Sequence, residues 1–92
     1  MDTPIIDLEG TLKERGGNYG DAMEHFNTTK NMYNVFKKRL GSMDDVRMCN
    51  MVEHVAYMIC DKLARASHNP YHLDNWRDIQ GYAKLLEKEL GK

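Results

Sequence analysis

The chain has 92 residues and a mass of 10.7 kDa, which is enough for one domain and too little for two separate hydrophobic cores. Apolar residues make up 41% of it, charged residues 29%, and the mean hydropathy is −0.69, which excludes disordered, collagen-like and membrane-embedded classes. The 13 Lys and Arg residues are balanced by 14 Asp and Glu, and the densest basic run, at 37–39, is interpreted as a solvated helix end. Because no overall positive field attracts a phosphate backbone, we expect neither a nucleic-acid nor a membrane partner.

The small size also predicts self-association. A chain of this length hides only about 60 to 65% of the surface that its unfolded form exposes, so a homo-oligomer is expected. An acid, Asp2, stands where a secretory signal would carry positive charge, and no apolar run reaches the roughly 18 residues that span a bilayer. The sequence therefore predicts a cytoplasmic protein.

Hydrophobic periodicity predicts an all-α fold with no strands. The predicted N-caps are Asp21 for the second helix and Ser42 or Asp44 for the third, while Gly41 and Pro70 mark breaks between helices. Together these signals predict a four-helix bundle-like single domain over residues 1–92. Its helices are expected at residues 5–15, 21–40, 44–67 and 72–90.

The predicted helix over residues 44–67 has an unusually wide apolar arc. Apolar side chains cover about 200° of its helical wheel, so the helix is expected to need neighbours on two sides. Cys49 and Cys60 lie roughly 16 Å apart along it, which is too far for a disulfide bond, and both are expected as buried thiols. Lys62 falls inside the arc. Either its stem runs along the apolar surface to solvent, or its ammonium group meets an acid or an anion.

A glycine inside the last predicted helix is a second irregularity. Gly81 costs that helix about 1 kcal/mol relative to alanine. A close crossing with another helix would account for its presence.

Five residues are candidates for binding a ligand: Arg15, Tyr19, His25, Lys62 and Arg65. Lys62 and Arg65 are one helical turn apart and suit a phosphate group, because arginine supplies a planar fork of donors and lysine a point charge. The alternative is structural, in that Lys62 and Arg65 pair with Asp78 and Asp74 across a helix interface. The sequence leaves both interpretations open.

Asp74 and Asp78 are also the candidate metal ligands. Their i, i+4 spacing places both carboxylates on one helical face, where they could coordinate a hard divalent cation, although such pairs are also common on exposed helices. His68 and His72 share this spacing, but Pro70 interrupts the helix between them, so zinc is not expected. The sequence therefore predicts no cofactor, with magnesium as the one ion that these two carboxylates could hold.

Three segments resemble a family of small, functionally uncharacterised proteins of bacteriophages and prophages. They are residues 14–21 (E-R-G-G-N-Y-G-D), 62–65 (K-L-A-R) and 72–83 (H-L-D-N-W-R-D-I-Q-G-Y-A). The resemblance extends from about residue 12 to residue 90. The last block is its most specific part, because charged, aromatic and glycine residues stand at fixed offsets.

That family in turn resembles the MazG-type nucleoside triphosphate pyrophosphohydrolases, which implies a helical, oligomeric protein with an affinity for nucleotides. Those enzymes hold magnesium with an E-x-x-E pair on one helix and an E-x-x-D pair on the next. This chain has no E-x-x-E, and its nearest equivalents are the single acids Glu53, Asp61, Asp74 and Asp78. Since magnesium needs several carboxylates together with substrate phosphates, robust catalysis is not expected.

Three functions follow as hypotheses. The first is a phage accessory protein that binds a nucleotide or another phosphate-bearing small ligand in the host cytoplasm, for nucleotide metabolism or counter-defence. The second is an interaction protein or inhibitor that docks the methionine-rich third helix on a host protein, because methionine surfaces adapt to varied partners. The third is a minimal magnesium-dependent nucleotide pyrophosphohydrolase.

Overall fold

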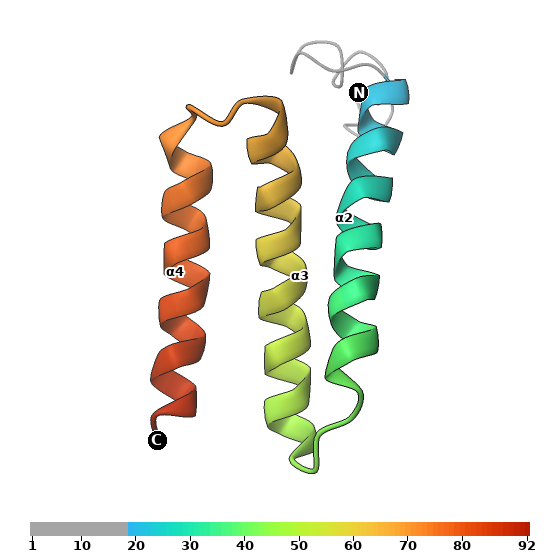
Figure 1. The fold of residues 1–92 in the computed structure, drawn as a ribbon. Helices are drawn as coiled ribbons and strands as arrows, with labels where there is room; N and C mark the ends of the chain where they lie inside the picture. The colour runs from blue at the N-terminus through green and yellow to red at the C-terminus, as the bar shows by residue number, and fades with distance from the viewer. Residues whose placement is uncertain (1–18) are drawn as a thin grey trace, which may run out of the picture.

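The structure is a computed structural model, which describes residues 19–92. This part of the chain is helical without strands and consists of α2 (Tyr19–Leu40), α3 (Val46–His68) and α4 (Leu73–Leu90) (Figure 1). The predicted all-α class is confirmed. The four-helix bundle-like arrangement is not found in residues 19–92, which form three helices, and the helix expected at 5–15 lies outside the described residues.

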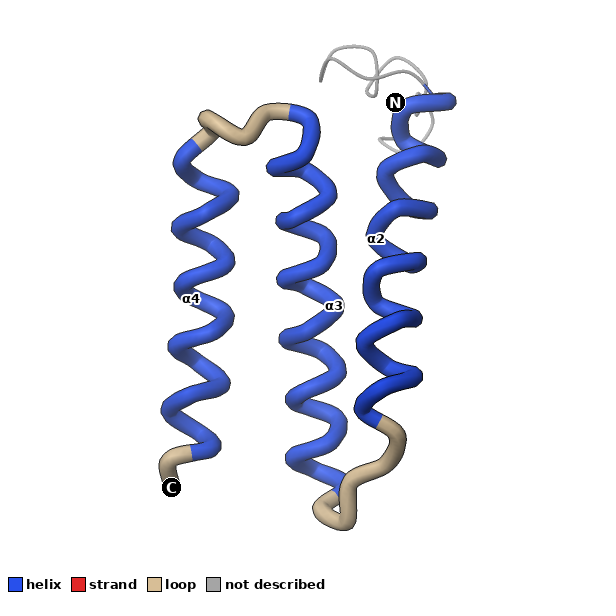
Figure 2. The backbone as a smooth tube through the Cα atoms, in the orientation of Figure 1, coloured by secondary structure: helices blue, strands red, loops and turns tan. Residues whose placement is uncertain are grey.

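The three described helices lie side by side in a single layer with α3 in the middle. α3 packs against both α2 and α4, whereas α2 and α4 do not contact each other. Short connections at residues 41–45 and 69–72 make each pair of neighbours antiparallel (Figure 2). This order confirms that the wide apolar arc of α3 needs neighbours on two sides. Within residues 19–92, no second layer of helices covers either broad side.

Backbone geometry explains where α2 ends and α3 begins. Gly41 adopts a positive φ of 68°, and its amide donates to the carbonyl of Lys37 at 3.1 Å, so glycine ends α2 as predicted. The N-cap of α3 is Asp45, whose carboxylate accepts a hydrogen bond from the Met48 amide at 3.0 Å. The prediction of Ser42 or Asp44 as this cap was wrong by one to three residues. Asp21 is likewise no cap, because it lies within the first turn of α2, where its charge suits the helix dipole.

The turn between α3 and α4 is held by two hydrogen bonds. The amide of His72 donates to the Asn69 carbonyl at 3.1 Å, and the indole Nε1 of Trp76 donates to the Pro70 carbonyl at 2.7 Å. Pro70 thus breaks the helix as predicted, and it also receives the first aromatic side chain of α4. This hydrogen bond ties the first turns of α4 to the connection that precedes it.

The core consists mainly of small side chains from α3. The buried apolar residues are Val55, Cys60, Ala64 and Ala66. Both cysteines are free thiols, but only Cys60 is buried as predicted, because Cys49 is half-buried. Burial raises the pKa of the Cys60 thiol. Four residues of this size exclude little apolar surface from water. The hydrophobic core of the described residues is therefore small, and it lies within the layer between the two broad sides.

Two polar side chains are buried in the helix contacts. Thr29 of α2 is only 2% exposed, and its Oγ1 has no hydrogen-bond partner. Asn75 of α4 is 8% exposed. An unpaired buried hydroxyl destabilises a fold, because the group has lost its bonds to water without replacement.

The predicted close crossing at Gly81 was wrong. A Cβ atom added to this glycine would meet no other atom within 4 Å, so its position on α4 faces open space. Its φ also lies outside the positive range that favours glycine. No steric or conformational reason for a glycine is present at this place in the described structure.

Candidate functional site

A carboxylate on α3 joins two of the predicted ligand-binding residues. Asp61 accepts a hydrogen bond from His25 Nε2 of α2 at 2.7 Å and another from Arg65 Nε at 3.1 Å (together the Asp61 cluster). Since an ionised carboxylate only accepts, His25 must carry its proton on Nε2. Burial raises the pKa of Asp61, but the hydrogen bonds from His25 and Arg65 outweigh this effect, so its pKa lies below the ordinary value. The cluster therefore links α2 to α3 by an ionised acid.

A small cavity of about 150 Å³ opens beside the Asp61 cluster. It lies between the first turns of α2 and the last turns of α3, and it is lined by Glu24, His25, Thr28, Ala64, Ser67 and His68. Two imidazoles and two hydroxyl groups could hold a small polar group there. The Glu24 carboxylate, which lines the same cavity, would repel an anion bound there.

The two cations proposed for a phosphate group both have acidic partners. Lys62 Nζ lies 3.0 Å from Asp78 Oδ2 of α4, which confirms the interpretation that its ammonium group meets an acid. The predicted pairing of Arg65 with Asp74 was wrong, because Arg65 pairs with Asp61, one turn earlier on its own helix. Instead, Asp74 Oδ2 lies 3.9 Å from His72 Nε2, just before the start of α4. The two cations thus lie one turn apart, each bound to its own carboxylate.

The remaining candidates are only partly placed. Arg15 lies outside the described residues, and so does the side chain of Tyr19. Asp74 and Asp78 both lie on α4, where Asp78 is occupied by Lys62. In residues 19–92 no group of three or more His, Cys, Asp or Glu side chains is arranged to hold a metal ion. Magnesium binding by Asp74 and Asp78 stays a prediction.

A second polar cluster connects the other end of α2 to α3. Lys37 forms an ion pair with Glu53, whose carboxylate also accepts from the Cys49 thiol at 3.4 Å. The hydrogen bond to Glu53 raises the pKa of Lys37, and the same bond lowers the pKa of Glu53. Residues 37–39 form the last turn of α2, as expected for a solvated helix end, and the Lys37 side chain stays 43% exposed although it pairs with Glu53.

Aromatic rings fill the contact between these two clusters. The rings of Tyr33 on α2 and Tyr57 on α3 meet edge to face, with centroids 5.2 Å apart. The ammonium group of Lys30 lies 5.9 Å from the centroid of each ring. The contact between α2 and α3 thus consists largely of polar, charged and aromatic pairs.

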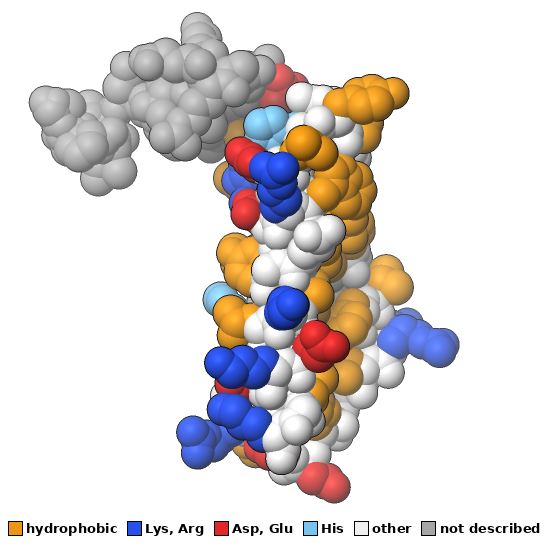
Figure 3. Space-filling view, turned by 90° about the vertical axis from the view of Figure 1, so that its left-hand side faces the viewer, with side chains coloured by type: hydrophobic (Ala, Val, Ile, Leu, Met, Phe, Trp, Pro, Cys, Tyr) orange, Lys and Arg blue, Asp and Glu red, His pale blue; other side chains and the backbone are white. Residues whose placement is uncertain are grey.

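One broad side of the layer is apolar. On α3, Ala56 and Leu63 point away from His54 and Arg65, and on α4 a stripe with a spacing of seven residues points away from Gly81. Seen from α4, many hydrophobic side chains lie along one edge of the molecule, from which a Lys or Arg side chain also projects, and most of the other charged side chains lie toward the opposite edge (Figure 3). We call this side the apolar face. Its apolar stripes are Met32, Val35 and Phe36 on α2, Val52, Ala56 and Leu63 on α3, and Trp76, Ala83 and Leu90 on α4. Helical spacing places one charged residue on each outer stripe, Arg39 on α2 and Glu87 on α4.

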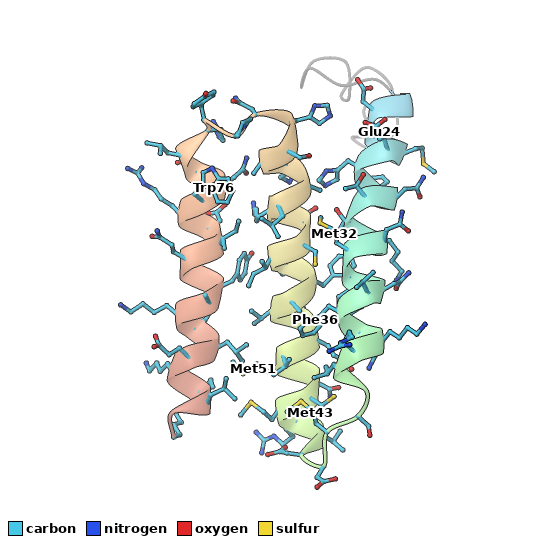
Figure 4. The ribbon with its side chains drawn as sticks, viewed as in Figure 1. Glu24, Met32, Phe36, Met43, Met51 and Trp76 are labelled. Atoms are coloured by element: carbon cyan, nitrogen blue, oxygen red, sulfur yellow. The ribbon has the colours of Figure 1, made fainter. Side chains whose placement is uncertain are left out.

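Several large side chains of the apolar face remain accessible to water. Phe36 and Leu63 are each 37% exposed, Trp76 is 40% exposed and Leu90 is 57% exposed. Met32 and Phe36 lie in the space between α2 and α3, where they widen the apolar surface of α3 (Figure 4). An exposed surface that is apolar across three helices is typical of a binding surface.

Two features of the site were not found from the sequence. Sequence reasoning treats Asp61 only as a single acid, although its i, i+4 spacing to Arg65 indicates an ion pair. The hydrogen bond between Asp61 and His25 joins residues 36 positions apart, so no local sequence pattern predicts it. The apolar face needs the order of the helices, which periodicity within one helix does not supply.

None of the three described helices combines the length and the apolar character that crossing a bilayer requires. This finding is consistent with the sequence, in which the apolar runs are short.

Comparison with known proteins gives a family and a phage relative. The model of a family described as "Domain of unknown function (DUF6378)" matches residues 9–90. The Gene 55 protein of Mycobacterium phage L5 is 34% identical over 76 residues, which span 82% of this chain and 44% of that protein. This relative supports the expected kinship with phage proteins, whereas no solved structure matches the chain. Because the family model covers most of its length, the chain belongs to the DUF6378 family.

Proposed function

We propose that this chain is a non-catalytic interaction module of a bacteriophage, which binds a protein partner through the apolar face. The observation that carries the proposal is the partial exposure of Phe36, Leu63 and Trp76 on one side of a single helical layer. Burying such side chains is worth roughly 1.5 to 3 kcal/mol each, so a partner gains much of its affinity from this surface. Proteins seldom leave a wide apolar surface in water without a use for it.

The charged groups support an interaction module over a phosphate-binding protein. Lys62 is held by Asp78, and Arg65 is held by Asp61, so an anion would have to compete with a carboxylate at each cation. The expected kinship with MazG-type enzymes would supply nucleotide affinity, but the acids that hold magnesium in those enzymes lack their counterparts here. The phage relative favours a role in host cells, in the cytoplasm, as an inhibitor or accessory protein.

Site-specific photo-cross-linking tests the proposal in bacterial cells that express the full chain. A photoreactive amino acid replaces Trp76, on the apolar face, and in the matched control it replaces His54, on the other side of the layer. We expect cross-links from position 76 to one protein that mass spectrometry identifies, and few from position 54. Equal cross-linking from both positions, or none from either, would contradict an interaction surface on the apolar face.

A phosphate-bearing ligand is the second candidate function, and the cavity beside the Asp61 cluster is the observation that favours it. His25 and His68 line this cavity, and Arg65 is bound to the same carboxylate as His25. Calorimetric titration with a panel of nucleotides and cyclic nucleotides tests it on the wild type, His25→Ala and Lys62→Ala. Binding that either substitution abolishes supports a ligand site, and binding that neither alters places the ligand elsewhere.

Hydrolysis of nucleotides is tested in the same samples. Magnesium-dependent release of pyrophosphate that disappears in Asp78→Asn would revive the enzyme hypothesis. Absence of turnover at high protein concentration would retire it.

A further inference from the structure

The cavity beside the Asp61 cluster is lined by hydrogen-bond acceptors. His25 uses the proton on Nε2 for Asp61, so the polar atom that its neutral ring has left is Nδ1, which carries a lone pair. Ser67 donates its hydroxyl proton to the Ala64 carbonyl at 2.6 Å, so its oxygen can only accept further bonds. The Glu24 carboxylate is also an acceptor. Three of the polar side chains that line the cavity therefore require donors from a ligand.

The remaining lining groups leave this preference intact, and Glu24 adds a charge to it. The Thr28 hydroxyl and the His68 ring can each donate or accept, and no Lys or Arg of residues 19–92 lines the cavity. Figure 4 shows Glu24 near the start of α2, at the end of the layer where α3 finishes. Among the residues that the structure describes, Glu24 forms no ion pair. Its negative charge is therefore not balanced within this part of the chain.

The end of α3 contributes further acceptors beside the cavity. The backbone carbonyls of Ala66, Ser67 and His68 accept no hydrogen bond from a backbone amide of residues 19–92. For Ala66 the cause is Pro70, which has no amide proton to donate four residues later. The helix dipole also places partial negative charge at this end of α3. The opposite dipole of α2 has little effect here, because its lining residues lie beyond its first turn.

The volume of the cavity restricts the ligand to a small group. The cavity measures about 150 Å³, whereas sites for whole cofactors or drug-sized ligands measure about 300 to 1,000 Å³. A whole nucleotide is therefore too large to enter it. A guanidinium group is small, positively charged and only a donor, with N–H groups that point in several directions from one plane. It is also more weakly hydrated than an ammonium group, so it loses less on leaving water.

We propose that this cavity binds a guanidinium group, whose N–H donors reach acceptors on α2 and α3 at once. Glu24 balances its charge, while Ser67 and His25 supply neutral acceptors. The inference goes beyond the apolar face, and it gives the cavity a ligand opposite in charge to the phosphate group of the second candidate function. The two ligands are therefore distinguished by the sign of the charge that binds.

NMR titration of the full chain with methylguanidinium tests the proposal, at slightly alkaline pH, where imidazole rings are mainly neutral, and at constant ionic strength. We expect saturable shifts of the amide signals of residues 24–28 and 64–68. Glu24 is exposed, so Glu24→Gln removes its charge and keeps the fold, and it should weaken binding at least about tenfold. Glu87→Gln removes the same charge from α4, which does not contact α2, and should leave binding within about twofold. The amide spectrum itself shows that each variant is folded.

The variant Arg15→Gln separates two sources of the guanidinium group, because Arg15, which lies outside the described residues, carries the same group. Equal binding of methylguanidinium by the wild type and Arg15→Gln assigns the cavity to another molecule. Binding by Arg15→Gln alone assigns it to Arg15, and Glu24→Gln is then compared in that background. Absence of shifts in both proteins at about 20 mM methylguanidinium overturns the proposal. It is also overturned if inorganic phosphate shifts these signals in place of methylguanidinium, or if Glu87→Gln weakens binding as much as Glu24→Gln.

Discussion

α3 has two neighbours and packs against them by different means. Its contact with α2 contains the Asp61 cluster, the Lys37–Glu53 pair and the meeting of two tyrosine rings. Within residues 19–92, its contact with α4 contains one ion pair, Lys62 with Asp78, together with the buried side chain of Asn75 and apolar packing. The contact with α2 is therefore specified by polar partners that must find each other. The contact with α4 is specified by shape and by the wide apolar arc of α3.

Replacing Asp61, the carboxylate that His25 and Arg65 share, should have the largest effect on the contact between α2 and α3. Asp61→Asn deprives His25 and Arg65 of a charged acceptor in the α2–α3 contact, where the Asp61 side chain is 22% exposed. Hydrogen bonds to charged groups contribute about 1.5 to 3 kcal/mol, so we expect a loss of about 2 kcal/mol in the free energy of unfolding. Urea denaturation at neutral pH measures it. A loss below about 0.5 kcal/mol would show that the polar pairs do not hold α2 in place.

The pH dependence of this loss provides its control. The pKa of Asp61 is lower in the folded chain than in the unfolded chain, so the stabilisation is complete above the ordinary carboxyl pKa of about 3.9. It disappears as the pH falls through the lower folded pKa, because both states then bind the proton. We expect the difference between the wild type and Asp61→Asn to shrink below about pH 4. A constant difference at all pH values would assign the effect to packing.

Thr29 offers a change of opposite sign in the same contact. Thr29→Val replaces a buried, unpaired hydroxyl by a methyl group of similar size in α2. Both residues have similar helix propensities, so we expect an increase of about 1 kcal/mol in the free energy of unfolding. Thr28→Val, one residue earlier and only partly buried, is the comparison, and urea titrations should show a smaller gain for it. A destabilised Thr29→Val would mean that the hydroxyl has a partner.

Gly81 tests the open side of α4. Gly81→Ala should stabilise the chain by about 1 kcal/mol, because alanine favours the helix and its Cβ meets no atom within 4 Å. Gly41→Ala is the matched control, since its Cβ also meets no atom, but its φ of 68° strains any residue with a side chain. We therefore expect Tm to rise for the first variant and fall for the second. A fall for both would reveal a contact at Gly81 that residues 19–92 do not supply.

Sequence reasoning was most accurate where one helix determines the answer, although it missed the Asp45 cap of α3 and the pair of Asp61 with Arg65. It gave the all-α class, the glycine that ends α2, the proline break and the need of α3 for neighbours on two sides. It failed where two helices must be aligned, as for the partner of His25 and the supposed crossing at Gly81. Helical periodicity gives the direction of a side chain around its own axis. The order, tilt and offset of neighbouring helices decide which side chains meet.

Removing the Lys62–Asp78 pair should give the smallest change in the free energy of unfolding among these tests. A correctly predicted ion pair can thus contribute little to stability. Lys62 is 20% exposed, but Asp78 is 48% exposed, and such partly solvated pairs contribute up to about 1 kcal/mol. Asp78→Asn should therefore cost less than Asp61→Asn, because the Lys62 stem can carry its ammonium group to water. A double-mutant cycle with Lys62→Met isolates the coupling between the two side chains. A coupling as large as that between His25 and Asp61 would show that both contacts of α3 depend on buried charge, and the distinction between its two neighbours would then fail.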